Sequence, residues 1–343
     1  MGFRVGMTYN IKGEIPSKPG DPPDLNAELD SEDTVRNIEN GLRDCGHEVV
    51  RLGGPRQLLD RTTPIDVDIV FNIAEGHEGR NRESQVPILL EMLHVPFVGA
   101  DGLTLGVTLD KVLTKKVLMA EGIPTPRFAE ATSLDRLDKL DLRYPLIVKL
   151  RSEGSSKGLS EKSLVNNPEE LRKQTAWLME TYPNFPVFIE EFIEGQEFTV
   201  AIIGNENPTV FPAVQVSLDG IMDLGRKFYT FAHLRSGASY HFPAPVPESL
   251  HKRMQELALA TYRAVECRDF GRVDFRTDQE GNPYVLEINP LPSLSIEDVF
   301  AIMAKVYGVT YASMIGRILD AGLVRHGLKA RDEAPTLSAI PSH

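Results

Sequence analysis

The chain has 343 residues, of which 41% are hydrophobic and 25% charged, and its formal net charge is −12 at pH 7. These values are typical of a globular protein of two or three domains, and the acidic balance argues against general nucleic-acid binding. No apolar run is long enough to cross a bilayer, and the apolar part of the N-terminus is too short for a signal peptide. Cys45 and Cys267 lack disulfide-like or metal-like spacing, so we expect free thiols in a reducing cytoplasm.

Strand and helix patterns alternate over residues 1–101. This alternation predicts an α/β domain in which a parallel sheet carries helices on its faces. Ser31 is placed to cap the first helix. The expected strands are 4–8, 48–52, 67–73 and 96–98, and the expected helices run from Ser31 through Leu42 and over 85–93.

Two further regions follow, at 102–190 and 191–327, and we expect the polar stretch 328–343 to be a frayed tail. In the first of them we expect helices at 110–120 and 168–180 and strands at 127–129, 146–150 and 187–192. In the second we expect a strand at 197–203, helices at 247–265 and 296–319, and a hairpin between them.

The hairpin pairs residues 271–276 with 283–290, and both arms alternate apolar and polar residues. A register with Asp278 opposite Pro283 puts Asp274 opposite Glu287, about 5 Å apart at Cβ. Asn289 shares the face of Glu287, and two carboxylates with an amide oxygen suit Mg²⁺. Arg272 beside them can stabilise charge on a transferred phosphoryl group. The alternative is a solvated strand face with a salt bridge.

A loop of small residues, 151–160, follows the buried strand 146–150. Gly154 and Gly158 allow positive φ, and successive backbone N–H groups in such a loop can cradle phosphate oxygens. Lys149 and Lys111 supply point charges suited to phosphate. The alternatives are an ordinary hairpin turn and, for Lys111, a solvated helix surface.

Residues 189–197 form a strand that leads into a short apolar linker. Such a linker can present backbone donors and acceptors to an adenine edge, and Glu197 can accept both ribose hydroxyls. The alternative for Glu190 and Glu191 is surface charge at a strand end.

In chain order these segments resemble the D-alanine–D-alanine ligase family of the ATP-grasp superfamily. The matching motifs are 109–111 with 114–115, 151–156, 190–201, 271–274 and 287–290. The resemblance implies a three-subdomain ATP-grasp fold: an N-terminal parallel α/β domain (1–101), a central subdomain (102–190) and a C-terminal subdomain (191–327).

The resemblance also implies roles for individual residues. ATP would be bound by Lys111, Lys149, Glu153, Ser156, Glu190, Glu191, Ile193 and Glu197. Two Mg²⁺ ions, or Mn²⁺, would be held by Asp274, Glu287 and Asn289. Arg272, Ser155 and Ser293 would act on the reacting groups.

The implied reaction is the ADP-forming joining of a carboxylate to an amine through an acyl phosphate, with amino acids or peptides as substrates. Positioning and charge neutralisation by metal ions and fixed cations suit such a phosphoryl transfer. The resemblance further implies a possible homodimer, and the free thiols are consistent with a cytoplasmic enzyme.

Two departures from the ligases fall in the N-terminal domain. The ligases carry a His-Gly step where this chain has Glu75-Gly76, so we expect the Glu75 carboxylate to bind a substrate ammonium. His77 is an alternative for part of that role, or an ordinary loop residue. Glu28, in the longer N-terminal loop, is expected to anchor the amine.

Two more departures fall in the C-terminal subdomain. Within 227–235, Arg235 takes the place of the lysine usual in the family, and the tyrosine position is lost. Where the ligases have glycine after the metal-binding asparagine, this chain has Ser293, whose backbone N–H can serve as an oxyanion donor. Ser295 is expected to bind the second substrate's carboxylate. The alternative is that both serines cap a helix beginning near 296.

Because these departures concern the amino-acid sites, other substrates stay open: another amino acid, a peptide, a small amine or a protein tail. The alternative from a different class is a non-catalytic ATP-binding regulatory module.

Overall fold

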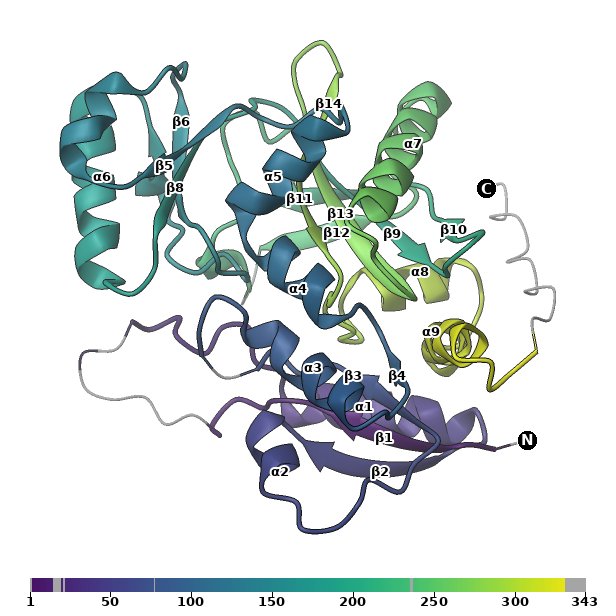
Figure 1. Ribbon diagram of the computed structural model, residues 1–343. Helices are drawn as coiled ribbons and strands as arrows, with labels where there is room; N and C mark the ends of the chain where they lie inside the picture. The colour runs from purple at the N-terminus through teal and green to yellow at the C-terminus, as the bar shows by residue number, and fades with distance from the viewer. Residues whose placement is uncertain (1, 15–19, 21, 77, 235–236, 331–343) are drawn as a thin grey trace.

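The computed structural model describes residues 2–14, 20, 22–76, 78–234 and 237–330. Within them the chain forms three sheets with helices packed around them (Figure 1). The strands are β1 Arg4–Thr8, β2 Glu48–Gly53, β3 Ile69–Asn72, β4 Phe97–Val98, β5 Phe128–Ala131, β6 Leu146–Leu150, β7 Leu164–Val165, β8 Val187–Glu191, β9 Glu197–Ile203, β10 Thr209–Val210, β11 Val214–Leu218, β12 Ala238–His241, β13 Phe270–Thr277 and β14 Pro283–Asn289. The α-helices are α1 Glu32–Asp44, α2 Pro55–Leu59, α3 Gln85–Met92, α4 Gly102–Leu109, α5 Lys111–Ala120, α6 Pro168–Thr181, α7 Glu248–Ala264, α8 Val299–Val306 and α9 Tyr311–Arg325.

The N-terminal sheet has the order β2-β1-β3-β4, and every pair in it is parallel. This confirms the parallel α/β arrangement predicted from the alternating pattern. Ser31 caps α1 as expected, since its side chain accepts a hydrogen bond from the backbone N–H of Thr34. The cap satisfies a donor that the first turn of a helix leaves without a partner.

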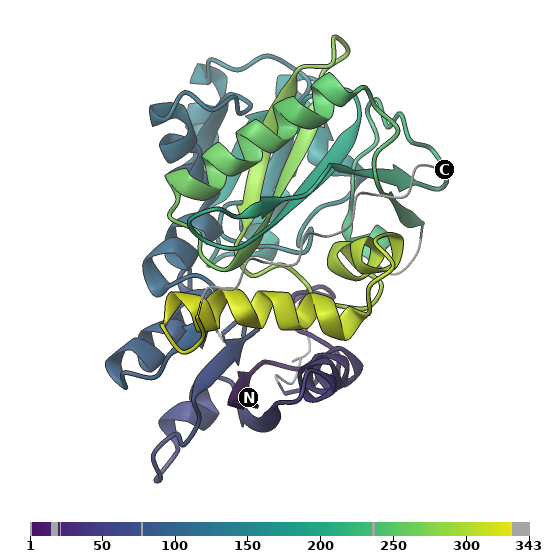
Figure 2. The same cartoon turned by 90° about the vertical axis from the view of Figure 1, so that its right-hand side faces the viewer.

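The other two sheets are antiparallel. The central one has the order β5-β8-β6-β7 and carries α6. The C-terminal one has the order β12-β11-β9-β13-β14, with β10 paired to β9, and α7 lies across its face (Figure 2). Helix α4 and strands β11 and β12 were not predicted from the sequence.

The β13–β14 register differs by one residue from the prediction at the turn. Thr277, rather than Asp278, lies opposite Pro283. An extra residue on β14, Leu286, then shifts the register between Phe275 and Asp274, so that Asp274 still lies opposite Glu287. A β-bulge of this kind re-aims the side chains beyond it, and here it produces the predicted pairing by a different route.

The prediction of a single helix at 296–319 is wrong, because the chain forms two helices here, α8 and α9, with a break between them. Gly308 lies between them with φ 67°, a left-handed conformation that suits glycine. Thr310 then caps α9 by accepting from the N–H of Ser313. The start of α8 is capped by Asp298, which accepts from the N–H of Val299, and neither Ser293 nor Ser295 is its cap.

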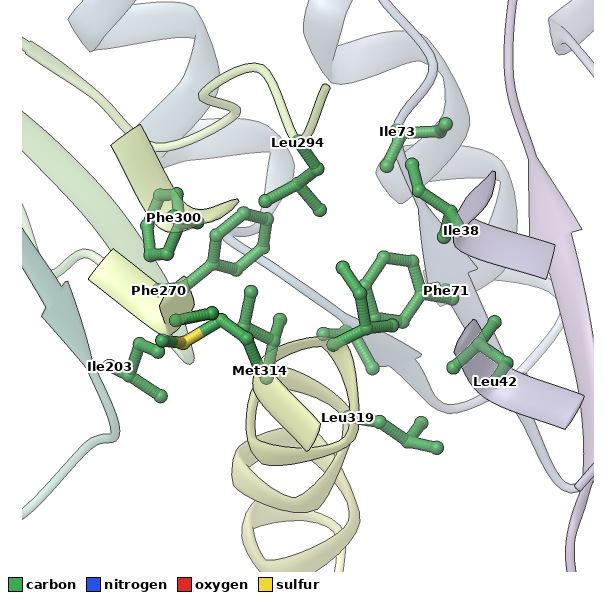
Figure 3. Packing of buried hydrophobic residues seen from close by; sticks show 14 of the residues in the cluster. Ile38, Leu42, Phe71, Ile73, Ile203, Phe270, Leu294, Phe300, Met314 and Leu319 are labelled. Carbon is green, nitrogen blue, oxygen red and sulfur yellow. The ribbon is translucent and has the colours of Figure 1, made fainter. Parts of the chain in front are cut away.

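The N-terminal sheet shares its largest core with the end of the chain. Ile38, Leu42, Phe71 and Ile73 pack in the same cluster as side chains from α8, α9 and β13 (Figure 3). Those from the C-terminal side include Ile203, Phe270, Leu294, Phe300, Met314 and Leu319. Helix α9 contacts α1, β4 and β9, so it joins the first and third regions of the chain.

No single helix among the described residues is long and apolar enough to cross a membrane. The bent pair α8 and α9, which meet at 115°, satisfies the length and composition criteria together, as buried core helices also can. Both helices contribute side chains to the core described above.

A buried ion pair reinforces this junction. Arg325 of α9 pairs with Asp269, which is fully buried, at 2.7 Å, and donates to the carbonyl of Phe97 at 2.7 Å. Asp269 also accepts from the N–H of Gly99 at 2.8 Å. The pair therefore ties α9 and the start of β13 to the end of β4.

We expect Arg325→Met to lower the free energy of unfolding by about 3–5 kcal/mol, because it leaves the Asp269 carboxylate buried without its cation. Urea denaturation measures the change. Adding Asp269→Asn to this variant is expected to recover part of the loss. Arg253→Met serves as the control, since Arg253 and its partner Glu256 are both half exposed. A loss in Arg325→Met no larger than in the control would contradict the prediction.

Candidate active site

Two adjoining cavities lie between the three regions. The larger, about 820 Å³, is lined by residues from the N-terminal loop, the loop 151–160 and the hairpin β13–β14. The smaller, about 100 Å³, lies between the central and C-terminal sheets. Both are lined by Ser156, Glu197, Asp274 and Glu287.

Nearly all the residues predicted from the sequence line one of these cavities. The larger contains Glu28, Glu75, Lys111, Glu153, Ser155, Ser156, Glu197, Arg272, Asp274, Glu287, Asn289, Ser293 and Ser295. The smaller adds Lys149, Glu190, Glu191 and Ile193. Arg235 and His77 lie outside the described residues.

The hairpin side chains form a hydrogen-bonded group around Asp274. Arg272 donates to both oxygens of the Asp274 carboxylate, at 3.0 and 3.1 Å. Asn289 donates to the same carboxylate at 2.9 Å, and Thr199 at 2.6 Å. Burial opposes the charge on Glu287, but Lys111, 3.4 Å away, helps to hold the pKa of this carboxyl below its usual range. The carboxyl groups of Asp274 and Glu287 therefore each lie beside a cation, Arg272 and Lys111 respectively.

The donor chemistry of this group fits Mg²⁺. The described residues contain no group of three or more His, Cys, Asp or Glu side chains arranged to hold a metal. A metal here would depend on Asp274, Glu287, the amide oxygen of Asn289 and phosphate oxygens of a nucleotide. Mg²⁺ is commonly bound in this way, through one or two carboxylates together with substrate phosphates.

The phosphate-loop candidate, residues 151–160, has an unusual backbone. Ser155 and Ser156 have φ of 47° and 52°, and Gly158 has φ of 73°, whereas Gly154, expected to use positive φ, does not. At Gly154 a Cβ would lie 2.9 Å from Oε1 of Glu28, so a larger residue there would displace the Glu28 side chain. Successive backbone N–H groups in a turn conformation can form a concave surface that binds anions.

Two lysines meet one carboxylate at the wall of the smaller cavity. Glu190 lies 2.6 Å from Lys149 and 2.8 Å from Lys115, and its side chain is 3% exposed. Burial alone would raise the pKa of Glu190, but the two lysines outweigh it and hold this pKa at about 2. Glu190 thus positions Lys149, and its side chain is not at the surface as the alternative interpretation required.

The residues after Glu190 have mixed environments. Glu191 accepts from the backbone N–H of Arg143 at 2.9 Å. The carbonyl of Ile193 accepts from Arg276 at 2.7 Å, and Arg276 also pairs with Glu197 at 3.0 Å. Arg276, which the sequence analysis did not single out, fixes the linker that leads to Glu197.

The N-terminal end of the larger cavity is rich in carboxyl groups. Burial, with the charge of Glu83 and Glu28, raises the pKa of Glu75 well above its usual range. Burial likewise raises the pKa of Glu83 and of Asp30 to about 7. Burial disfavours the charged forms of these carboxyl groups, and a cation that enters beside them stabilises those charged forms.

Glu28, predicted to anchor an amine, is already engaged. Its Oε1 accepts from Arg82 at 2.6 Å and from the backbone N–H of Gly154, and its Oε2 lies 3.1 Å from Lys157. Arg82 and Lys157 outweigh the effect of burial and hold the pKa of Glu28 below its usual range. Its charge is therefore balanced within the protein.

The opposite wall contains side chains that the sequence analysis missed. Tyr229 and Tyr240 both line the cavity, as does Asp298. Asp298 lies 3.8 Å from Arg272. Ser293 and Ser295 also line this wall. The pairing of β11 with β12 brings Tyr240 here, and neither strand was predicted.

Comparison with known proteins bears on this arrangement. The family model described as D-ala D-ala ligase C-terminus matches residues 117–320 of the chain. The chain belongs to the D-alanine–D-alanine ligase family. The resemblance drawn from the sequence motifs is thereby confirmed.

Relatives of this D-alanine–D-alanine ligase family member cover most of its length. A protein of Sinorhizobium fredii named uncharacterized protein y4sG is 36% identical over 300 residues, covering 84% of this chain and 87% of that protein. A D-alanine–D-alanine ligase of Carboxydothermus hydrogenoformans is 32% identical over 299 residues, covering 83% of this chain and 91% of the ligase. Membership in this family favours an enzyme over the non-catalytic nucleotide-binding module.

Solved structures of the family confirm the ATP-grasp fold class. The structure of D-alanine–D-alanine ligase from Bacillus anthracis complexed with ATP superposes with a TM-score of 0.73 at 24% sequence identity. The match covers 96% of this chain and 100% of that one. The predicted three-subdomain fold with an N-terminal parallel α/β domain is therefore correct.

We expect Glu190→Gln to lower the free energy of unfolding by about 3–5 kcal/mol at pH 7, because Lys115 and Lys149 then lie buried without their shared anion. In the unaltered protein, this stabilisation is present above the ordinary pKa of 4.5 and is lost as pH falls toward about 2, since the folded-state pKa is lowered.

Urea denaturation across this pH range measures both effects. Glu191→Gln is the matched control, because the side chain of Glu191 is 17% exposed and its ion pair with Arg127 is long, at 3.4 Å. Equal stability of the two variants at pH 7 would contradict the assignment.

Proposed function

We propose that this chain is an ATP-dependent ligase that joins two D-alanine molecules through an amide bond, with release of ADP and phosphate. The observation that carries the proposal is the pairing of Asp274 with Glu287, beside Arg272 and facing the loop 151–160 across one cavity. The names of the relatives support the choice of D-alanine.

In the proposed reaction, a carboxylate oxygen of the first D-alanine attacks the γ-phosphorus of ATP, and the bond to the bridging oxygen breaks to release ADP. The amine of the second D-alanine then attacks the carbonyl carbon of the acyl phosphate, and phosphate leaves as the amide forms and the amine loses its protons. Mg²⁺, when bound, supplies Lewis-acid neutralisation of phosphate charge.

The chain's own residues supply the remaining electrostatics. Lys149 and Lys111 are proposed to hold phosphates, and the backbone of Ser155 and Ser156 is proposed to cover those phosphates. The guanidinium of Arg272 is held by two hydrogen bonds to Asp274. This fixed position supports the proposal that Arg272 stabilises developing negative charge without reorganisation. Ser293 is proposed to donate its N–H to the same oxygen.

For the first substrate, we propose that Glu75, with Glu83 beside it, binds the ammonium group. The charge of Glu28 is already balanced by Arg82 and Lys157, whereas within the described residues Glu75 has no ion pair. Ser295 is proposed to bind the second carboxylate. That Arg235 takes the place of the family's lysine, in the loop over the site, stays a prediction.

Cytoplasmic location and dimerisation are part of the proposal. The free thiols Cys45 and Cys267 suit a reducing compartment. Sedimentation of the purified chain measures its oligomeric state.

The test is ADP release with MgATP and a panel of D- and L-amino acids, singly and in pairs, with mass spectrometry of the products. We expect D-alanine-dependent ADP release and a dehydrated dipeptide mass. The double variant Asp274→Asn/Glu287→Gln is expected to lose roughly 100-fold or more in turnover, since the metal contributes several kcal/mol to the transition state.

If no amino acid or pair in the panel causes ADP release, although ATP binding is confirmed, D-alanine ligation is contradicted. Turnover only with a different acceptor would keep the ligase and replace its substrate. Unchanged turnover in the double variant would remove the metal assignment.

The raised carboxyl pKa values give a proton-linked prediction. Near pH 7, part of the Glu83 population carries a proton before the substrate binds, since its pKa is raised to about 7, and the pKa of the neighbouring Glu75 is raised as well. An ammonium beside them favours the anions, so D-alanine binding is expected to release protons between about pH 6 and 7.5.

Calorimetry in buffers of different ionisation enthalpy measures this release, with a non-hydrolysable ATP analogue present. Glu75→Gln is expected to reduce the release and to weaken D-alanine binding by about 1.5–3 kcal/mol. Glu78→Gln, an exposed position in the same segment, is the control. Binding without proton release in the unaltered protein would contradict this ammonium site.

A further inference from the structure

Four charged side chains form a buried cluster between the N-terminal domain and the loop 151–160. Arg82 lies 2.6 Å from Glu28 and 3.1 Å from Glu153, and Lys157 pairs with the same two carboxylates. The four side chains are 2–8% exposed. Two cations balance two anions, so the cluster is neutral as a whole, which limits the energetic cost of burying it.

The cluster also holds the loop backbone. Arg82 donates to the carbonyl of Ser152 at 2.9 Å, while Glu28 accepts from the N–H of Gly154. Further along the loop, Asp24 accepts from the N–H of Gly158 at 2.7 Å. The N-terminal segment therefore attaches to the loop on both sides of Ser155 and Ser156.

The residues between these attachments keep their donors free. Within the described part of the chain, neither Ser155 nor Ser156 donates its backbone N–H to another residue, and both line the larger cavity. Lys111, which is proposed to hold phosphates, is linked to the same cluster, because it donates to the carbonyl of Glu153 at 2.6 Å.

We propose that Arg82 is a positioning residue for nucleotide phosphates: through Glu28, Glu153 and the Ser152 carbonyl it fixes the loop 151–160 so that Ser155 and Ser156 face the cavity. Arg82 is suited to this because its planar guanidinium can bond three acceptors at fixed angles, which a lysine cannot do. The inference rests on the proposed function only in naming the reaction that follows nucleotide binding, and the role of Arg82 in that binding does not depend on which amino acids are joined.

Nucleotide binding to the full-length Arg82→Met variant tests the inference. With Mg²⁺, we expect AMPPNP to bind at least roughly tenfold more weakly, because removing one partner of a buried charge cluster is strongly unfavourable and frees the loop. AMP, which lacks the β- and γ-phosphates, is expected to bind within about twofold of the unaltered protein. Amide hydrogen exchange at Gly154 and Gly158 is expected to become faster.

Two further variants separate positioning from folding. Arg172→Met removes an exposed arginine paired with Asp138 in the central subdomain, and it is expected to change none of these readouts. Arg82→Lys keeps the charge without the three-way geometry, and we expect it to restore the melting temperature while AMPPNP binding stays severalfold weak. If Arg82→Met does not fold, Arg82→Lys decides.

A folded Arg82→Met or Arg82→Lys variant with unchanged AMPPNP affinity and unchanged exchange at Gly154 would overturn the inference. Equal weakening of AMP and AMPPNP would also overturn it, since that pattern indicates general damage. Because these readouts need no amino acid, failure of D-alanine ligation with selective loss of AMPPNP binding would refute the proposed function and support the role of Arg82.

Discussion

The antiparallel pairing of β13 with β14 is the constraint on which the candidate site depends. It brings the carboxylates of Asp274 and Glu287 opposite each other. Repulsion between these like charges destabilises the pair unless cations lie beside them. Arg272 and Lys111 supply those cations from different elements, one from the same strand and one from the start of α5. The site is therefore assembled only when the hairpin register and the position of α5 are both correct.

Charge is distributed unevenly along the larger cavity. Near the hairpin and the loop 151–160, lysines and an arginine face the space where phosphates are proposed to lie. Near the N-terminal loop, the cavity is lined by the carboxyl groups of Glu75 and Glu83, whose raised pKa values reflect their burial. An ammonium group that enters there favours the charged form of these carboxyl groups, so this end of the cavity suits a cation and the end near the hairpin suits an anion.

Local patterns in the sequence were enough to predict many of the strands, helices and loops that form the candidate site. Period-two alternation in β13 and β14 predicted which side chains share a face, and small residues after a buried strand predicted the loop 151–160, part of which lines the larger cavity. The break at Gly308 and Thr310 was missed, although both residues are of types that end and begin helices. Arg82 was not predictable in this way: its partners lie 54 and 71 residues away, and only the folded chain brings them together.

The shared core of α9 and the N-terminal sheet has a consequence for biosynthesis. The first strands leave the ribosome long before residues 299–325, yet their buried face is completed by those residues (Figure 3). Without residues 299–325, the buried face of the N-terminal sheet that includes Phe71 lacks the side chains that cover it. A nascent chain that has not yet released these residues therefore has an apolar surface that a chaperone can bind.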